Sequence, residues 1–173
     1  MAEAAEDNRG YRPIEAFAAI GDCHGGALVA NDGGIDWCCL GRFDADPVFC
    51  RLLDAKRGGF SSVRFYGHVS TNRRYIENTN VLETEFRAAS GRVLVTDFMP
   101  VGRRPDSGVH DYVHLNAPRW LVRRIDAVEG EVDLAVTVAP SVAFAAEPVR
   151  LDGGRHAVRV SGGPAIASRP LGR

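Results

Sequence analysis

Glu83 and Glu85 are the acidic residues whose spacing fits a known type of catalysis. Glycoside hydrolysis needs two carboxyl groups, one acid and one base, which lie about 5 to 9.5 Å apart depending on the stereochemistry. Two residues apart on a strand, Glu83 and Glu85 share a face, with about 6.5 to 7 Å between their Cα atoms. A general acid also needs burial that raises its pKa, and an exposed strand face does not supply it. We therefore expect a solvated or interface face rather than a catalytic pair.

Two histidine-containing stretches carry weaker signals for metal binding or nucleophilic catalysis. His110 and His114 are four residues apart, a spacing that holds a metal ion when it occurs on a helix. Gly108 and Pro118 flank them and disfavour a helix, so no metal site is predicted. Residues 22–24 read Asp-Cys-His, but neighbours on an extended chain point apart. We interpret this stretch as a turn whose aspartate bonds nearby amides.

Trp37, Arg42, Phe43 and Asp44 combine, within eight residues, the two kinds of side chain that hold sugars. Aromatic rings pack against the C–H surface of a sugar, and arginine or aspartate forms paired hydrogen bonds with its hydroxyl groups. The alternative is structural: Trp37 and Phe43 belong to the core, and Arg42 pairs with Asp44 or Asp36. Because buried aromatic residues mostly serve packing, the structural alternative is favoured. The four residues remain candidates for the rim of a sugar site.

The composition is that of an ordinary globular domain. The chain has 173 residues, of which 45% are hydrophobic and 25% charged, and this predicts one domain with a sizeable core. A formal charge of −1 does not favour binding to nucleic acid or to an anionic membrane. No apolar run approaches the roughly 20 residues of a membrane helix. Residues 1–10 are polar and acidic, without the pattern of a signal peptide, and are predicted to be a disordered leader.

The four cysteines all lie in the first third of the chain. They are Cys23, Cys38, Cys39 and Cys50. No Cys-x-x-Cys pair occurs, so a zinc ribbon is disfavoured, and no phosphate loop or dinucleotide fingerprint is present. Without an export signal, we expect reduced thiols that act as small buried hydrophobes in the cytoplasm. The sequence predicts neither a metal ion nor a cofactor.

Short apolar or alternating stretches recur along the chain, separated by turn residues. The predicted strands span residues 27–30, 35–40, 60–65, 81–87, 92–99, 120–128, 132–139, 142–151 and 156–160. Residues 132–139 have the cleanest alternation of a half-buried strand, whereas residues 67–72 and 101–118 are interpreted as loops. Many short strands at hairpin spacing and one short helix predict an all-β, antiparallel sandwich.

The first predicted hairpin and the only predicted helix lie close together in the chain. Asn, Asp and Gly residues at 31–34 tolerate positive φ, as a tight hairpin turn requires. Asp46 and Pro47 have the pattern of an N-cap followed by a first-turn proline. Apolar residues then recur at helical spacing from Val48, which predicts a short helix near residues 47–55.

Three blocks of this sequence resemble the opening of bacterial proteins of glycoside hydrolase family fifteen, the trehalase-like and glucoamylase-like group. The matching residues are Ile20-Gly21-Asp22, Ala27-Leu28-Val29, Asp32-Gly33, Ile35-Asp36-Trp37, Cys39-Leu40, Arg42-Phe43-Asp44, Val48-Phe49, Leu52-Leu53, Arg74-Tyr75, Thr79 to Thr84 and Val95 to Pro100. Gly34 and Gly41 replace the serine and proline that are usual there. The resemblance implies that residues 11–173 form the trehalase-like N-terminal β-sandwich domain, incomplete at its C-terminal end and of the supersandwich type.

The resemblance also implies a function. In that family the sandwich precedes an (α/α)6 barrel whose glutamates hydrolyse an α-glucosidic bond with inversion, and no residue of this chain matches those glutamates. The implied role is a non-catalytic domain, inactive alone, that supports a barrel in cis or in an adjacent chain. The loop at Trp37, Arg42, Phe43 and Asp44 would then face the barrel's active-site rim and a possible α-glucoside.

Two alternatives remain open at this point. One is a free-standing β-sandwich that binds carbohydrate or a protein partner without catalysis. The other is an independent small hydrolase that uses Glu83 and Glu85.

Overall fold

The computed structural model describes residues 11–111, 114–154 and 157–169. The predicted leader, residues 1–10, lies outside the described residues. The strands are β1 (Phe17–Gly21), β2 (Gly26–Ala30), β3 (Ile35–Cys39), β4 (Phe49–Cys50), β5 (Phe60–Phe65), β6 (Ser70–Tyr75), β7 (Leu82–Ala88), β8 (Gly91–Phe98), β9 (Gly102–Arg103), β10 (Leu115–Asn116), β11 (Val122–Gly130), β12 (Leu134–Ala139), β13 (Leu151–Gly153), β14 (Ala157–Val160) and β15 (Ala165–Ala167). Two short 3-10 turns, η1 (Ile14–Ala16) and η2 (Ala143–Ala145), are the helical elements of the described chain.

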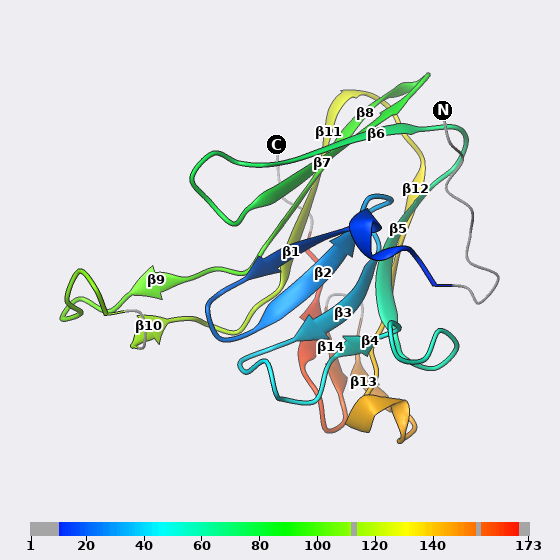
Figure 1. The fold of residues 1–173 in the computed structure, drawn as a ribbon. Helices are drawn as coiled ribbons and strands as arrows, with labels where there is room; N and C mark the ends of the chain where they lie inside the picture. Colours follow the sequence, from blue (N-terminus) through cyan, green and yellow to red (C-terminus); the bar gives the residue numbers. More distant parts are fainter. Residues whose placement is uncertain (1–10, 112–113, 155–156, 170–173) are drawn as a thin grey trace.

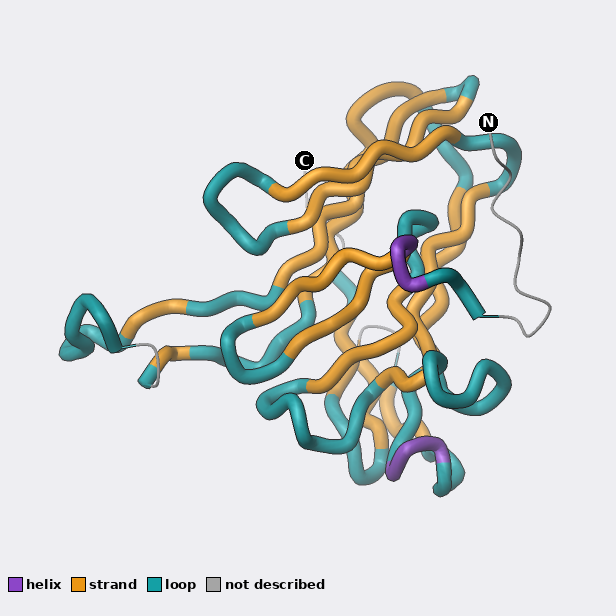
Figure 2. Tube along the Cα trace, viewed as in Figure 1, coloured by secondary structure: helices purple, strands orange, loops and turns teal. Residues whose placement is uncertain are grey.

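Two large antiparallel sheets form the body of the molecule (Figure 1). One has the order β1-β2-β3-β5-β12, with β4 paired to β3, and the other has the order β11-β8-β7-β6. A three-stranded sheet, β13-β14-β15, lies toward the C-terminal end. In Figure 2, the small β9–β10 pair extends away from both large sheets. The predicted all-β, antiparallel sandwich is confirmed.

Alternating burial along β7 and β8 builds one side of the core. Leu82, Thr84 and Phe86 are buried while the residues between them are partly exposed, as the sequence pattern predicted. On β8, Val93 and Val95 are buried, and the Phe86 ring stacks on Phe65 of the other sheet. Full burial of each such side chain contributes about 1.5 to 3 kcal/mol, so these residues hold the sheets together.

A buried ion pair within one sheet also bonds a residue of the other sheet. Asp97 on β8 lies opposite Arg123 on β11, and Arg123 donates to both carboxylate oxygens of Asp97 at 2.7 and 3.0 Å. Arg123 donates a further hydrogen bond to the Ser61 hydroxyl on β5, at 3.2 Å. Asp97 is fully buried and the Arg123 side chain is 10% exposed. Since a buried charge needs a partner, this bidentate pair fixes β8, β11 and β5 relative to one another.

The predicted hairpin between β2 and β3 is present. Gly33 has φ +81°, and Asp32 accepts a hydrogen bond from the Gly34 amide at 2.9 Å. A Cβ atom on Gly33 would lie 3.1 Å from the Phe86 ring. Glycine is therefore required at this position for both its conformation and its lack of a side chain.

The helix predicted near residues 47–55 is wrong. Phe49 pairs with Cys38 of β3, the Val48 amide donates to the Cys38 carbonyl at 2.7 Å, and the Cys50 amide donates to Gly58 at 2.6 Å. A turn follows in which the Leu53 and Asp54 amides donate to the Cys50 carbonyl, and in a second turn the Gly58 amide donates to the Asp54 carbonyl at 2.8 Å. Because Val48 and Phe49 are both buried, a short strand uses the apolar residues that the helical spacing had assigned to a helix.

Three further assignments differ from the sequence interpretation. The loop expected at residues 67–72 contains the start of β6. This strand has mostly polar side chains, so a search for hydrophobic patterns does not detect it. The strand expected over residues 142–151 is replaced by η2, with positive φ at Ala143, Phe144 and Ala145. β1 was not predicted, because its alanines and glycine carry little strand preference.

Candidate functional site

The outer face of β1, β2 and β3 carries a row of partly exposed apolar side chains. Ala19, Leu28 and Trp37 lie directly opposite one another in the ladder, so their side chains share one face. Leu28 and Trp37 are partly exposed and Ala19 is exposed, whereas Ile35 is 1% exposed. This apolar row is therefore distinct from the core.

One extra residue in β3 explains why Trp37 and Ile35 face opposite ways. Leu28 pairs with Trp37 and the next residue, Val29, pairs with Ile35, so Asp36 is a bulge residue without a ladder partner. Asp36 is 4% exposed and contacts the Arg12 guanidinium, which also bonds Asp32 at 2.6 Å. The bulge thus gives the buried carboxylate of Asp36 a charged partner from outside the sheet.

The loop that follows β3 crosses the same outer face. Phe43 lies over Gly26, where an added Cβ would come within 3.1 Å of the ring, and Gly26 pairs with Cys39. Phe43 remains 67% exposed. The structural alternative placed Trp37 and Phe43 in the core. Phe43 does not lie there, and Trp37 is only partly buried. Both rings lie on the solvent side of the sheet, while Phe43 covers a glycine.

Arg42 and Asp44 form a bidentate ion pair on this loop. Arg42 donates through Nε and Nη2 to the two carboxylate oxygens of Asp44, each at 2.7 Å, and both side chains are exposed. The hydrogen bond from Arg42 lowers the pKa of Asp44, and the same bond raises the pKa of Arg42. Both groups therefore stay charged, and they hold each other where a hydroxylated ligand or a protein surface can reach them.

Arg119 lies beside this loop and was not identified as a site residue from the sequence. A Cβ on Gly41, which has φ +91°, would lie 2.8 Å from the Arg119 side chain. Arg119 itself has φ +61°, and Trp120 is 63% exposed. Trp120 had been assigned to a strand that in fact begins at Val122. No local pattern shows that the segment before β11 lies beside Gly41.

Glu83 and Glu85 are held by arginines rather than arranged for catalysis. Glu83 accepts two hydrogen bonds from Arg74, at 3.0 and 2.8 Å. Glu85 bonds Arg92 at 2.9 Å and Arg87 at 2.6 Å, and these bonds lower its pKa. A general acid in a glycosidase has a raised pKa, whereas the arginines lower the pKa of Glu85.

In each of the two histidine-containing stretches an aspartate accepts hydrogen bonds from backbone amides close to it in sequence, and residues 112 and 113 lie outside the described residues. The Asp22 carboxylate accepts hydrogen bonds from the backbone amides of His24 and Gly25, at 3.0 and 2.7 Å. Asp111 accepts from the His114 amide at 2.9 Å. Across residues 11–111, 114–154 and 157–169, no three His, Cys, Asp or Glu side chains gather as metal ligands would.

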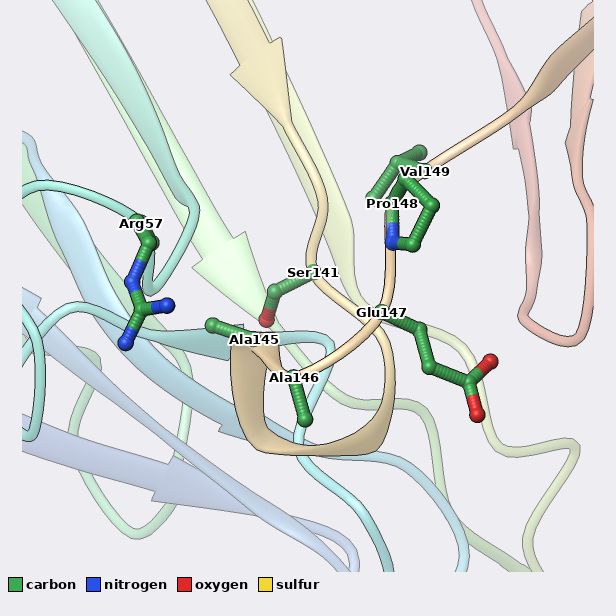
Figure 3. A pocket seen from close by; sticks show the side chains of 7 residues that line it. All are labelled: Arg57, Ser141, Ala145, Ala146, Glu147, Pro148 and Val149. Carbon is green, nitrogen blue, oxygen red and sulfur yellow. The ribbon is translucent and has the colours of Figure 1, made fainter.

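Two open cavities occur away from the Phe43 loop. One, of about 360 Å³, is lined by Arg57, Ser141 and residues 145–149. In Figure 3, the Glu147 carboxylate points away from Arg57, so the two charges do not converge on a common point. The other, of about 460 Å³, lies between the hairpin turn at Asn31 and strands β5 to β7. Each cavity has one carboxyl group in its lining, Glu147 or Asp32, so neither supplies the two carboxyl groups that glycoside hydrolysis uses.

None of the helical turns in the described part of the chain is long and apolar enough to cross a bilayer.

Comparison with known proteins identifies the family. The family model "Trehalase-like, N-terminal" matches residues 8–170. A trehalase of Mycolicibacterium smegmatis is 28% identical over 137 residues, which are 76% of this chain and 20% of the relative. A trehalase of Thermoplasma volcanium is 30% identical over 151 residues, 85% of this chain and 23% of the relative. The chain thus spans about a fifth of the length of these relatives, and no solved structure matches it. The chain belongs to the trehalase-like N-terminal domain family.

Proposed function

We propose that this domain is the non-catalytic N-terminal part of a hydrolase of α-glucosidic bonds, within glycoside hydrolase family fifteen. Its share of the work is to support a catalytic (α/α)6 barrel, in cis or from an adjacent chain. The observation that carries this proposal is the family match over residues 8–170, together with relatives named trehalase, of which the matched part makes up about a fifth. The domain alone is expected to be inactive, because Glu83 and Glu85 are bound by arginines.

We further propose that the Phe43 loop shapes the rim of the barrel's active site. Trp37, Arg42, Phe43 and Asp44 supply two aromatic rings and one fixed ion pair on a single face of the sheet. The unpaired thiols of all four cysteines support a cytoplasmic location, since disulfides are rare there.

The rim proposal is tested in a chimera. The N-terminal fifth of the M. smegmatis trehalase is replaced by this chain, and trehalose hydrolysis is measured for the chimera and for its Phe43→Ala variant. We expect Phe43→Ala to lower kcat/KM by about tenfold, which corresponds to about 1.4 kcal/mol of transition-state stabilisation. The matched control is Tyr66→Ala, because Tyr66 is 64% exposed and Phe43 is 67% exposed.

The outcomes separate the possible functions. Equal activity of the Phe43→Ala and Tyr66→Ala chimeras would remove the rim role while leaving the supporting role in place. Trehalose turnover by the isolated 173-residue chain, lost in Glu83→Gln, would overturn the non-catalytic assignment.

A binding module without catalysis is the second candidate. The observation that favours it is the exposure of Phe43, next in sequence to Arg42 of the Arg42–Asp44 pair, because an aromatic ring beside polar groups suits sugars. Calorimetric titration of the isolated domain with trehalose and maltose tests it. Binding that is weakened in Phe43→Ala would support the module, and the absence of heat would exclude it for these two sugars.

A further inference from the structure

The cavity of about 460 Å³ lies beside the hairpin turn between β2 and β3, at the far end of β2 from Phe43. Phe43 covers Gly26 at the start of β2, whereas Asn31 and Asp32, which line the cavity, follow the last residue of that strand. The volume is within the range of about 300 to 1,000 Å³ that is usual for small-molecule sites. This cavity is therefore a candidate binding site apart from the Phe43 loop.

β5 continues past the end of β3, so part of one edge of β5 is open. Among the described residues, Ile35 is the one member of β3 that pairs with β5, opposite Ser61, because the hairpin turn comes directly before Ile35. Along its other edge, β5 pairs with β12 over its whole length. Within the described chain, residues 62–65 thus have no strand beside them on the side of the hairpin turn.

The backbone groups at this open edge can be identified. The Tyr66 amide donates to the Asp133 carbonyl, and residues alternate in an antiparallel ladder, so the odd-numbered residues of β5 face the hairpin turn. The N–H and C=O groups of Val63 and Phe65 therefore face the cavity that both residues line. No hydrogen bond to these four groups occurs among the described residues, although Val63 is only 4% exposed. Backbone groups of a buried residue need a partner, so this edge suits a ligand with both donors and acceptors.

The other walls of the cavity supply an apolar surface and further polar groups. Phe65 and Phe86 stack with their ring centroids 4.3 Å apart, and both line the cavity. Thr71 of β6 lies opposite Phe86, so its exposed side chain shares the face of the sheet that Phe86 occupies. Asn31 and Asp32 add an amide and a carboxylate from the hairpin turn. Aromatic rings and uncharged hydrogen-bonding groups thus border one space.

The charges of the lining residues do not favour an ion. Arg12 donates to Oδ2 of Asp32 at 2.6 and 3.2 Å, and Oδ1 of Asp32 accepts from the Gly34 amide at 2.9 Å. The Asp32 carboxylate is therefore compensated by Arg12. Arg64 also lines the cavity, but successive side chains of a strand alternate between its faces, so the Arg64 side chain leaves β5 on the outer face.

We propose that this cavity binds a neutral sugar of one or two pyranose rings. The C–H face of the sugar packs on the Phe65 ring. Its hydroxyl groups, each of which is both a donor and an acceptor, complete the hydrogen bonds of Val63 and Phe65. The side chains of Thr71 and Asn31 bond the hydroxyl groups on the other sides of the ring. This site needs no catalytic barrel, so it goes beyond the proposed function.

A sugar fits this edge better than an extended peptide does. A peptide that adds a strand bonds alternate residues along an edge, and here the outward-facing residues next to the turn are Val63 and Phe65. The turn itself closes one end, because a Cβ on Gly33 would lie 3.8 Å from the Val63 Cβ. The open edge is thus short, and a compact ligand with hydroxyl groups around a ring reaches all of its polar groups.

Amide chemical shifts of the isolated 173-residue chain, recorded while trehalose or maltose is titrated into the millimolar range, test the proposal. We expect saturable shifts at Val63 and Phe65. Thr71→Trp fills the cavity from an exposed position and should weaken binding by at least about tenfold. Thr71→Val removes one hydroxyl and should weaken it by about fivefold, the effect of one neutral hydrogen bond. The matched control is Ser70→Trp, since Ser70 is also exposed on β6 but its side chain lies on the opposite face; it should bind like the wild type.

The other outcomes would overturn the proposal. Shifts confined to residues 42–44 would place the sugar at the Phe43 loop instead. The absence of shifts at Val63 and Phe65 with both sugars, or an equal loss of binding in Ser70→Trp and Thr71→Trp, would show that the cavity is no sugar site. A short uncharged peptide that shifts these amides when neither sugar does would assign the edge to strand addition. Because the barrel takes no part in the titration, each of these results leaves the supporting role of the domain in place.

Discussion

At the scale of single residues, the charged groups serve structure more clearly than chemistry. Asp97 and Arg123 were not identified from the sequence as partners, because they lie far apart in the chain and only the register of β8 and β11 brings them together. Removing one member of a buried pair leaves the other charge without compensation. The pair should therefore be among the most sensitive positions of the fold.

Asp97→Asn is expected to lower the free energy of unfolding by about 3 to 5 kcal/mol, because Arg123 would stay buried without its counter-charge. Urea denaturation measures the change. Asp126→Asn is the control, since Asp126 pairs with the exposed Arg124 and such pairs contribute about 1 kcal/mol or less. Similar losses in the two variants would show that the buried Asp97–Arg123 pair contributes no more to the free energy of unfolding than the Arg124–Asp126 pair does.

The thiols should differ sharply in reactivity. Cys23 is exposed, whereas Cys38, Cys39 and Cys50 are buried. Burial raises the pKa of Cys38 from 9.0 to about 12, so its reactive thiolate is scarce at neutral pH. We expect Cys23 to react with a thiol reagent in the native protein and the other three only after unfolding. Rapid modification of Cys38 in the native state would contradict its burial.

The raised pKa of Cys38 also makes the stability of the fold depend on pH. Because the folded protein disfavours the Cys38 thiolate, the unfolded chain loses this proton first as the pH rises. The associated stability is present below about pH 9 and is lost between that value and the folded pKa of about 12.

At the scale of elements, glycine at the first hairpin illustrates what the sequence can predict. The Asn-Asp-Gly-Gly stretch predicted a turn, and Gly33 has the positive φ that such turns use. The contact between Gly33 and the Phe86 ring was not predictable, because it depends on how the sheets stack.

Gly33→Ala should therefore cost more than backbone strain alone. Alanine at positive φ destabilises by more than about 1 kcal/mol, and here its Cβ would also press on the Phe86 ring. Gly67→Ala is the control, because Gly67 also has positive φ but nothing lies within 4 Å of an added Cβ. Thermal unfolding should show the larger loss for Gly33→Ala; equal losses would mean that the ring yields without cost.

The errors in element assignment have a common physical cause. Val48, Phe49, Leu52 and Leu53 recur at helical spacing, but only Phe49 lies in the short strand β4, and its pairing with Cys38 excludes a helix there. β6 was not predicted because it is an edge strand with mostly polar side chains. Strands that depend on long-range pairing rather than on their own alternation cannot be recognised locally.

At the scale of the whole molecule, many short stretches at hairpin spacing predicted an antiparallel sandwich, and the alternation of β7 and β8 is among the patterns that the structure confirms. The candidate site was predictable only in part. Trp37, Arg42, Phe43 and Asp44 are neighbours in sequence, whereas Arg119 reaches Gly41 only through the fold. The exposure of side chains along β12 was also not predicted, since residues 132–139 have the pattern of a half-buried strand.

The bulge at Asp36 has a consequence for how this hairpin tolerates changes in length. Excising Asp36 would leave Leu28 opposite Trp37 and Val29 opposite Ile35, because the ladder already skips it. What would be lost is the anchor for Arg12, and with it part of the hold on the segment that precedes β1. The extra residue in this strand thus anchors the N-terminal segment through Arg12, and its carbonyl also accepts a hydrogen bond from the Leu52 amide at 3.4 Å.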